Sequence, residues 1–245
     1  MADAYRADRA ENRLTVRRIL HDVGQSYRHR FGRVVIAAAL VFGATATIGV
    51  AIERGLDIAE ANPIIFLFAL AGSTMSQIGI TFYAGLLDKV VGEFELGEEP
   101  EPIGQVLRTL PYARLLIADL LITAAAVVGA AFFVIPGLIL FTLFSLAGPI
   151  VNIENRGPID AMRRSARLVR PHFWFVLLFV TIPIGLEHQA IHVVHDLYLQ
   201  ERLVEIFIVQ GLVGMIVGSF VGLVEVNIAY ALVAEDRARA TRVES

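Results

Sequence analysis

One apolar stretch constrains the fold of this chain more than any other feature. It runs from Leu115 to Val151 and is interrupted only by Asp119 and a few small polar residues. A single helix of this length would extend about 55 Å, whereas the hydrocarbon core of a bilayer is about 30 Å thick. Because Pro136-Gly137 lies near its middle, we predict a tight hairpin there, joining membrane spans at Leu115–Ile135 and Leu138–Ile153.

Four further segments are apolar over a length that fits a membrane crossing. They are Val34–Ile52, Pro63–Leu87, Phe173–Val194 and Val204–Ala234. Hydrophobic residues make up 56% of the chain and charged residues 18%, a balance typical of a membrane protein. We therefore predict an all-α integral membrane protein. Its six-transmembrane-helix bundle occupies residues 34–234, between an N-terminal segment (1–33) and a short tail (235–245).

The distribution of Lys and Arg predicts the orientation of this bundle. Of the 21 Lys and Arg residues, all but Arg54 and Arg202 fall in the N-terminal segment, the 88–114 and 153–172 connections, and the tail. The positive-inside rule then places both termini in the cytoplasm. The first 33 residues are too charged for a signal peptide, so we expect them to be retained. The absence of cysteine excludes disulfides, thiolate metal sites and cysteine nucleophiles.

A short amphipathic helix is predicted before each transmembrane hairpin. The apolar residues that recur at helical spacing before the first span are Val16, Leu20, Val23, Tyr27 and Phe31. Those before the third span are Ile103, Val106, Leu107 and Leu110. Before the fifth span, one side of the helix holds Ile159, Met162, Ala166 and Val169, and the adjacent arc holds Arg163, Arg164, Arg167 and Arg170. Such helices lie at a membrane surface with arginines on anionic headgroups. The pattern fits three repeats of surface helix plus hairpin, and it fits equally well a protein without repeats.

Glu154 is predicted to lie at the inner membrane edge, just before the arginine-rich helix. A carboxylate there would pair with an arginine of that helix and hold the helix against the bundle. We favour this structural clamp over a ligand site. The functional alternative is a phosphate-bearing lipid headgroup held by Arg163, Arg167 and Arg170. The candidate residues for contact with lipid or a protein partner are Glu154, Arg163, Arg164, Ser165, Arg167 and Arg170.

The same region resembles a known family. The residues that carry the resemblance are Pro136, Gly137, Pro149, Glu154, Gly157, Ala161, Arg163, Arg164, Ser165 and Trp174. They are similar to the signature of the membrane domain fused to some bacterial glycerophosphoryl diester phosphodiesterases, and of related uncharacterised six-span bacterial membrane proteins. The resemblance implies a location in the bacterial cytoplasmic membrane. It does not bring the hydrolase activity, because the spans occupy the length that a soluble catalytic domain would need.

Three histidines near the predicted outer end of span five are candidate metal ligands. His188, His192 and His195 share one helix face, with Asp196 beside them. Since His188 and His195 lie about 10 Å apart along the axis, one ion cannot readily take all three from a straight helix. The workable sets are His188 with His192, or His192 with His195 and Asp196, each completed by another element such as Glu201 or Glu205. Imidazoles at a wet interface need no partner, so we favour ordinary interfacial histidines over a metal site or a pH-responsive contact.

Small and polar residues inside the spans have both structural and functional interpretations. Gly214, Gly218 and Gly222 allow close helix packing, which we expect within the bundle rather than in a dimer. Polar residues within the spans are Ser73, Thr74, Ser76, Gln77, Thr81, Asp119, Glu205, Gln210, Glu225 and Asn227. Intramembrane ionisable residues are candidate functional sites. We favour interhelical hydrogen bonds over a transport path for them, and expect Asp119 and Glu225 to reach the cytoplasmic interface.

These observations support three functional hypotheses. The first is a non-enzymatic membrane protein that binds or organises anionic lipids or a protein partner, including another copy of itself. The second is a small transporter with a polar cavity between spans two, three and six. The third is a metal-dependent enzyme at the outer face. The sequence carries no nucleic-acid-binding motif and no cofactor-binding loop.

Overall fold

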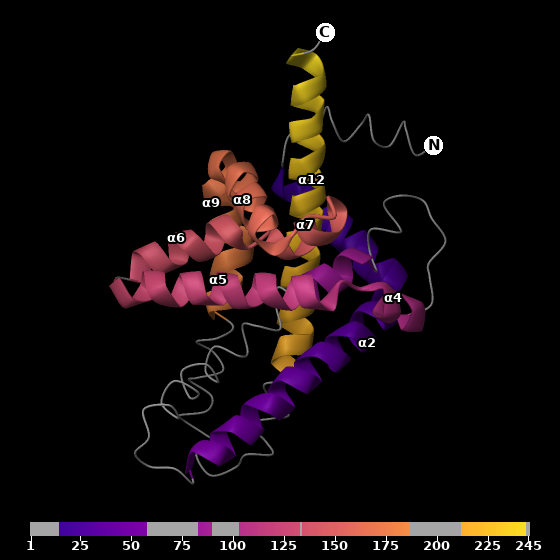
Figure 1. The fold of residues 1–245 in the computed structure, drawn as a ribbon. Coiled ribbons are helices and arrows are strands. Elements are labelled where there is room, and N and C mark those ends of the chain that lie inside the picture. The colour runs from indigo at the N-terminus through magenta and orange to yellow at the C-terminus, as the bar shows by residue number, and fades with distance from the viewer. Residues whose placement is uncertain (1–14, 58–82, 90–102, 133, 187–211, 244–245) are drawn as a thin grey trace.

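The computed structural model describes residues 15–57, 83–89, 103–132, 134–186 and 212–243 (Figure 1). All regular secondary structure within these ranges is helical, as the all-α prediction requires. Three stretches are long and apolar enough to cross a membrane: Ile135–Ile153, Pro158–Leu186 and Met215–Thr241. A shorter apolar helix covers Phe31–Ala44. The chain therefore has the character of a membrane protein, while most of the predicted second span lies outside the described residues.

Helix α12 (Ser219–Val243) forms the centre of the described structure. It contacts α2 (Val16–Asp57), α7 (Ala147–Ile153) and α8 (Pro158–Val169). The protein buries 72% of the apolar window of Met215–Thr241, against 33% for Pro158–Leu186. A helix that is apolar on all sides is stable when surrounded by others. We conclude that α12 is an interior helix and that the Pro158–Leu186 stretch is peripheral.

The N-terminal half of α2 does not form the separate surface helix that the sequence suggested. Residues Val16 to Asp57 are one continuous helix. Ile19 and Val23 are buried against the body of the protein, whereas Val16, Leu20 and Phe31 of the predicted apolar stripe are exposed. No proline interrupts this region, so the helix that precedes the first predicted span continues straight into it.

The α5–α6 hairpin is present, but its turn lies a few residues before the predicted one. Helix α5 ends at Phe132 and α6 begins at Val134 and ends at Phe144. Pro136 therefore sits in the first turn of α6, where its missing N–H has no intrahelical acceptor to lose. Gly137 lies against Gly129 of α5: a Cβ atom added to Gly129 would be 2.9 Å from the Gly137 backbone. The Pro-Gly pair thus permits close helix packing instead of forming the turn.

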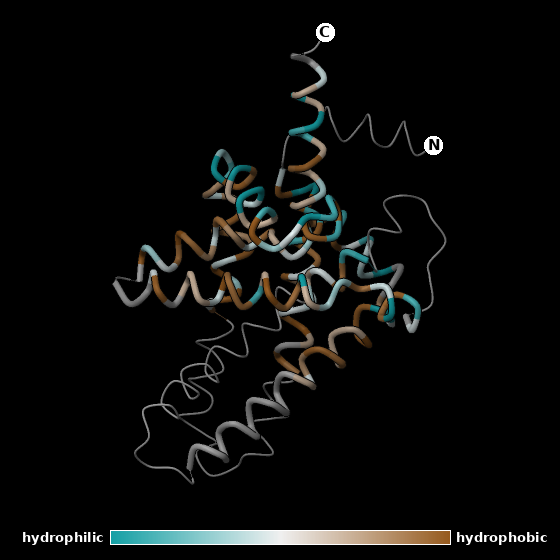
Figure 2. The backbone as a smooth tube through the Cα atoms, in the orientation of Figure 1, coloured by the Kyte–Doolittle hydropathy of each residue, from teal (hydrophilic) through white to brown (hydrophobic). Residues whose placement is uncertain are grey.

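Helices α5 (Tyr112–Phe132) and α6 lie side by side and run across α12 in Figure 1. The short α4 (Ile103–Thr109) precedes them. After α6, a buried turn at Ser145 and Leu146 leads into α7. The chain then forms α8, a 3-10 turn η1 (Arg170–His172), α9 (Phe173–Val176) and a π-helical stretch η2 (Leu177–Thr181). Hydrophilic residues gather about α8 and the C-terminal end of α12 (Figure 2).

The predicted glycine contacts of the last span lie within the chain. A Cβ atom on Gly222 would be 2.8 Å from the Leu87 side chain and 3.1 Å from that of Tyr83, and one on Gly218 would collide with the Phe42 ring. Gly214 begins the π-helical stretch η3 (Gly214–Gly218) that leads into α12. The Tyr83 hydroxyl donates to the Val34 carbonyl over 3.1 Å and lies 3.0 Å from the Ser219 hydroxyl. This packing within the chain is the alternative that we favoured for Gly218 and Gly222.

Exposed apolar residues recur every fourth position along the peripheral stretch after α8. They are Trp174, Leu178, Ile182 and Leu186. Such a stripe would be unfavourable in water, but it suits contact with lipid chains. Trp174 is 78% exposed at the start of the stripe, and tryptophan is enriched where a helix passes from headgroups into hydrocarbon.

Substitution of Gly129 tests the α5–α6 contact. The Gly129→Val variant should lose about 1–3 kcal/mol of stability, because its side chain meets backbone that cannot rotate away. Gly24→Val on α2 is the matched control, since a Cβ atom there meets nothing within 4 Å. Its effect should stay within about 0.5 kcal/mol. Thermal unfolding in detergent measures both variants, and equal midpoints would contradict the observed packing.

Candidate functional site

The turn between α7 and α8 lies beside α5, and a side chain of α5 helps to hold it in place. Glu154 caps the C-terminus of α7, and its backbone N–H donates to the Ile150 carbonyl over 3.1 Å. Asn155 then adopts a positive φ of 49°, a conformation that asparagine tolerates better than most residues. This reversal points the Glu154 and Arg156 side chains at each other, and the Arg114 guanidinium of α5 fixes the turn by donating to Asn155 Oδ1 over 2.8 Å.

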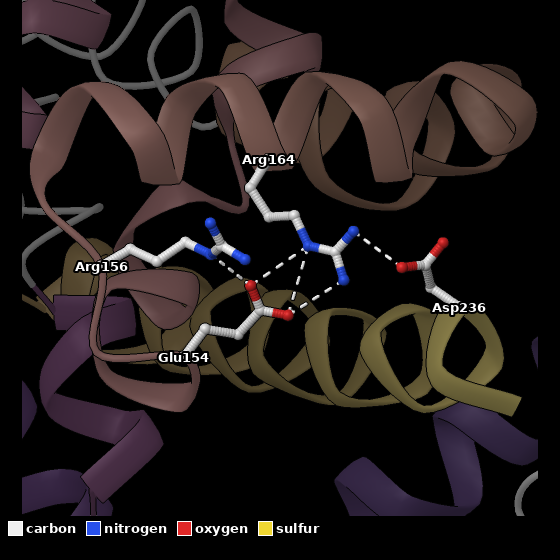
Figure 3. Close-up of polar contacts among 4 residues, drawn as sticks. All are labelled: Glu154, Arg156, Arg164 and Asp236. Atoms are coloured by element: carbon white, nitrogen blue, oxygen red, sulfur yellow. Dashed lines mark hydrogen bonds and ion pairs between the residues drawn. The ribbon is translucent and has the colours of Figure 1, made fainter. Parts of the chain in front are cut away.

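Arg164 of α8 joins this turn to the central helix (Figure 3). Its Nε lies 3.1 Å from Glu154 Oε2, and its Nη2 lies 3.0 Å from Oε1. Its Nη1 lies 2.7 Å from Asp236 Oδ2 on α12. Arg156 supplies a second hydrogen bond donor to Glu154 Oε2. Two carboxylates and two guanidinium groups thus form a charge-balanced cluster, in which the two-pronged contact with Glu154 is the strong arrangement for this pair.

The inner half of the cluster is withdrawn from solvent. The side chains of Glu154 and Arg164 are 8% and 11% exposed, against 46% for Asp236. Burial alone raises the pKa of a carboxyl group. Here the hydrogen bonds and positive charges of Arg164 and Arg156 outweigh burial and hold the pKa of Glu154 below its ordinary value. The Glu154 carboxylate therefore stays ionised at neutral pH.

Two further contacts hold α8 and its C-terminal turn on the body of the protein. The buried Ser165 hydroxyl donates to the Leu143 carbonyl of α6 over 2.7 Å. In η1, His172 Nε2 lies 3.4 Å from Glu235 Oε2 on α12, too poorly aligned for a hydrogen bond. The predicted pairing of Glu154 with an arginine of the next helix is thus confirmed. The sequence analysis does not anticipate Arg156 as a second partner of Glu154, nor Asp236 as a partner of Arg164, although Asp236 lies at the point where the apolar run of the last span ends.

The cluster divides the six predicted contact residues into two groups. Glu154, Arg164 and Ser165 face inward, so they are not free to meet a headgroup. Arg163, Arg167 and Arg170 are exposed. The side of α8 that packs on the protein differs from the apolar side that the sequence predicts: the buried residues are Ala161, Ser165, Leu168 and Val169, whereas Ile159 is 57% exposed. The physical reason is that Ala161 and Ser165 are small enough for α8 to pack closely on its own chain.

A second group of polar side chains lies inside the protein. Asp119 of α5 and Glu225 of α12 are each 1% exposed, and Asn227 is 2% exposed. Asp119 and Glu225 are therefore shielded from solvent by the protein itself, and their depth relative to the cytoplasmic interface stays a prediction. Glu225 Oε1 has no hydrogen-bond partner within the described structure. The predicted polar residues of spans two and six between 73 and 81 and between 205 and 210 lie outside the described residues.

The candidate metal ligands His188, His192, His195 and Asp196 also lie outside the described residues. Among the residues that are described, no group of three His, Asp or Glu side chains is arranged to hold a metal ion. The preference for ordinary interfacial histidines over a metal site therefore stays a prediction.

The chain matches no protein-family model, no curated protein and no solved structure. The phosphodiesterase-associated membrane domain therefore remains a resemblance in about forty residues around the α7–α8 turn.

Removal of the Glu154 carboxylate tests the structural role of the cluster. Glu154→Gln should cost about 2 kcal/mol, less than the ~3–5 kcal/mol of a fully orphaned buried partner, because Arg164 keeps Asp236. Asp160→Asn is the matched control: Asp160 pairs with Arg163 at 3.9 Å with both side chains largely exposed, so its loss should cost under ~1 kcal/mol. Unfolding midpoints in detergent should separate the two variants, and equal shifts would refute a buried clamp.

The wild-type protein and Glu154→Gln should also differ in their response to pH. The pKa of Glu154 is lower in the folded protein than in the unfolded chain, so its stabilising effect is fully present above the unfolded value of about 4.3 and is lost as pH falls through the folded value. The wild-type midpoint should therefore approach that of Glu154→Gln in acid. A constant difference down to low pH would show that the carboxylate is not the source of the stabilisation.

Proposed function

We propose that this chain is a non-enzymatic integral membrane protein that binds and organises anionic lipids at the cytoplasmic surface. In this proposal the chain crosses the bacterial cytoplasmic membrane six times and keeps both termini in the cytoplasm, as the Lys and Arg distribution favours. Helix α8 lies at the inner surface, and its arginines contact lipid phosphates. Another protein, or a second copy of the chain, would then associate through the lipids so gathered or through the same arginines.

The observation that carries the proposal is the contrast between adjacent arginines on α8. Arg164 is buried and shared between two carboxylates, whereas Arg163, Arg167 and Arg170 are exposed. Among these four arginines the cluster uses only Arg164, so it fixes α8 and leaves Arg163, Arg167 and, just beyond α8, Arg170 exposed. Guanidinium groups bind phosphate well because they offer several donors in one plane, and each arginine near an anionic surface contributes about 1 kcal/mol of attraction.

Lipid suits this surface better than a soluble ligand because the chain beyond α8 is apolar and uncovered. Trp174 comes four residues after Arg170 and begins the exposed apolar stripe that ends at Leu186. A chain that passes from the headgroups into the hydrocarbon typically presents arginines first, then a tryptophan and then aliphatic side chains. The arginines are thereby expected at the level of lipid phosphates.

A transporter is the second candidate, and the buried carboxylates Asp119 and Glu225 favour it. Acidic side chains inside a membrane protein are costly and commonly serve ion or proton movement. They come from two different helices, α5 and α12, and both are shielded from solvent. In a transporter, Glu225 would take part in ion movement. Ion flux in proteoliposomes should then be abolished by Glu225→Gln and not by the α8 arginine variants.

Trp174 provides the test of lipid binding, because it is the only tryptophan in the chain. Energy transfer from Trp174 to pyrene-labelled lipids in proteoliposomes reports which lipids lie near α8. Labelled phosphatidylglycerol should be enriched over labelled phosphatidylcholine, and the enrichment should disappear in Arg163→Gln/Arg167→Gln/Arg170→Gln. It should also weaken at high salt, since the Debye length shortens to about 3 Å at 1 M.

The matched control removes the same charge elsewhere. Arg17, Arg108 and Arg237 are exposed on α2, α4 and α12, and changing all three to Gln should preserve the enrichment near Trp174. Equal transfer to both lipids in the wild-type protein would contradict the proposal. Loss of enrichment in the control would show that overall charge, and not α8, attracts the lipids.

A further inference from the structure

The outer side of α8 carries its cations in a row. Arg163 and Arg167 are exposed on α8, and the exposed Arg170, the first residue of η1, continues the same path because its backbone N–H donates to the Ala166 carbonyl. On an ideal helix the three arginines fall within about 60° of one another. At 1.5 Å per residue, Arg163 and Arg167 are about 6 Å apart along the axis, and Arg163 and Arg170 are about 10 Å apart. A phosphate beside Arg167 and Arg170 therefore leaves room for a second phosphate beside Arg163, about 6–10 Å farther along the axis.

The charge on this row also exceeds that of one lipid phosphate. The three arginines supply three positive charges, and the exposed Asp160 carboxylate, 3.9 Å from Arg163, offsets one of them. The remaining charge of two matches two phosphodiesters. Arg164 does not add to the row, because its guanidinium is occupied by Glu154 and Asp236.

We propose that the outer side of α8 selects an anionic lipid whose headgroup holds two phosphates joined by a short bridge, as in a bis-phosphatidyl lipid. This inference rests on the proposed lipid-binding function and names the lipid class. One phosphate lies at Arg167 and Arg170, near Trp174, and the other lies at Arg163. A lipid that carries both phosphates loses its translational freedom only once on binding. Its second phosphate therefore meets Arg163 at a high effective concentration. Two separate single-phosphate lipids gain no such advantage.

Trp174 energy transfer tests this selection with the full chain in proteoliposomes. Pyrene-labelled bis-phosphatidylglycerol and pyrene-labelled phosphatidylglycerol are compared at equal total phosphate. The bis-phosphatidyl lipid should be enriched roughly fivefold more, the factor expected when one further arginine–phosphate contact forms. Arg163→Gln should lower the enrichment of the bis-phosphatidyl lipid more than that of phosphatidylglycerol, and so bring the two enrichments close to each other.

Asp160→Asn is the converse variant. Removal of the carboxylate that competes for Arg163 should increase the preference for the bis-phosphatidyl lipid. Equal enrichment of the two lipids in the wild-type protein would overturn the inference and leave lipid binding intact. Absence of enrichment for either lipid would overturn both proposals. An unchanged preference in Arg163→Gln would place the second phosphate elsewhere and likewise overturn the inference.

Discussion

The position of α8 depends on one buried ion pair, between Arg164 and Glu154. Neither side chain is more than 11% exposed, so each would be a costly unpaired charge without the other. Such a pair adds little net stability compared with apolar packing, but it strongly disfavours arrangements that separate its members. Because Arg164 also contacts Asp236, the pair fixes α8 against both the end of α7 and the central helix α12. Helical geometry then directs the exposed arginines away from the cluster.

In a membrane protein, an apolar side chain that the chain itself leaves exposed can face lipid instead of water. Helix α12 is buried by the chain itself, whereas the stripe from Trp174 to Leu186 is left uncovered. In water this stripe would promote aggregation, but against lipid chains it costs nothing. The polar side chains have the opposite distribution. Glu225 and Asp119 are shielded inside the helices, and the arginines of α8 lie at the side of the protein where hydrophilic residues gather (Figure 2).

The sequence predicts interactions between neighbours in the chain better than it predicts how helices meet. The pairing of Glu154 with an arginine ten residues later was accessible, because a carboxylate at a membrane edge needs a nearby cation. Asp236 was not, since its approach depends on how the last helix crosses α8. The hydrophobic pattern identifies Ile159 on the apolar side of α8, but it does not reveal that the small residues Ala161 and Ser165 pack on the rest of the chain. The sequence predicts a turn at Pro136-Gly137 because nothing in it reveals that Gly137 faces Gly129.

The orientation of α8 is the central claim, and cysteine labelling measures it most directly. The chain contains no cysteine, so single cysteines can be placed at 161, 163, 165 and 167 in turn. Inside-out membrane vesicles, which expose the cytoplasmic surface, are then treated with a membrane-impermeant maleimide. Cysteines replacing Arg163 and Arg167 should react readily, while those replacing Ala161 and Ser165, both fully buried, should stay protected until the protein is unfolded. Equal labelling at all four positions, or faster labelling at 161 and 165, would contradict the account.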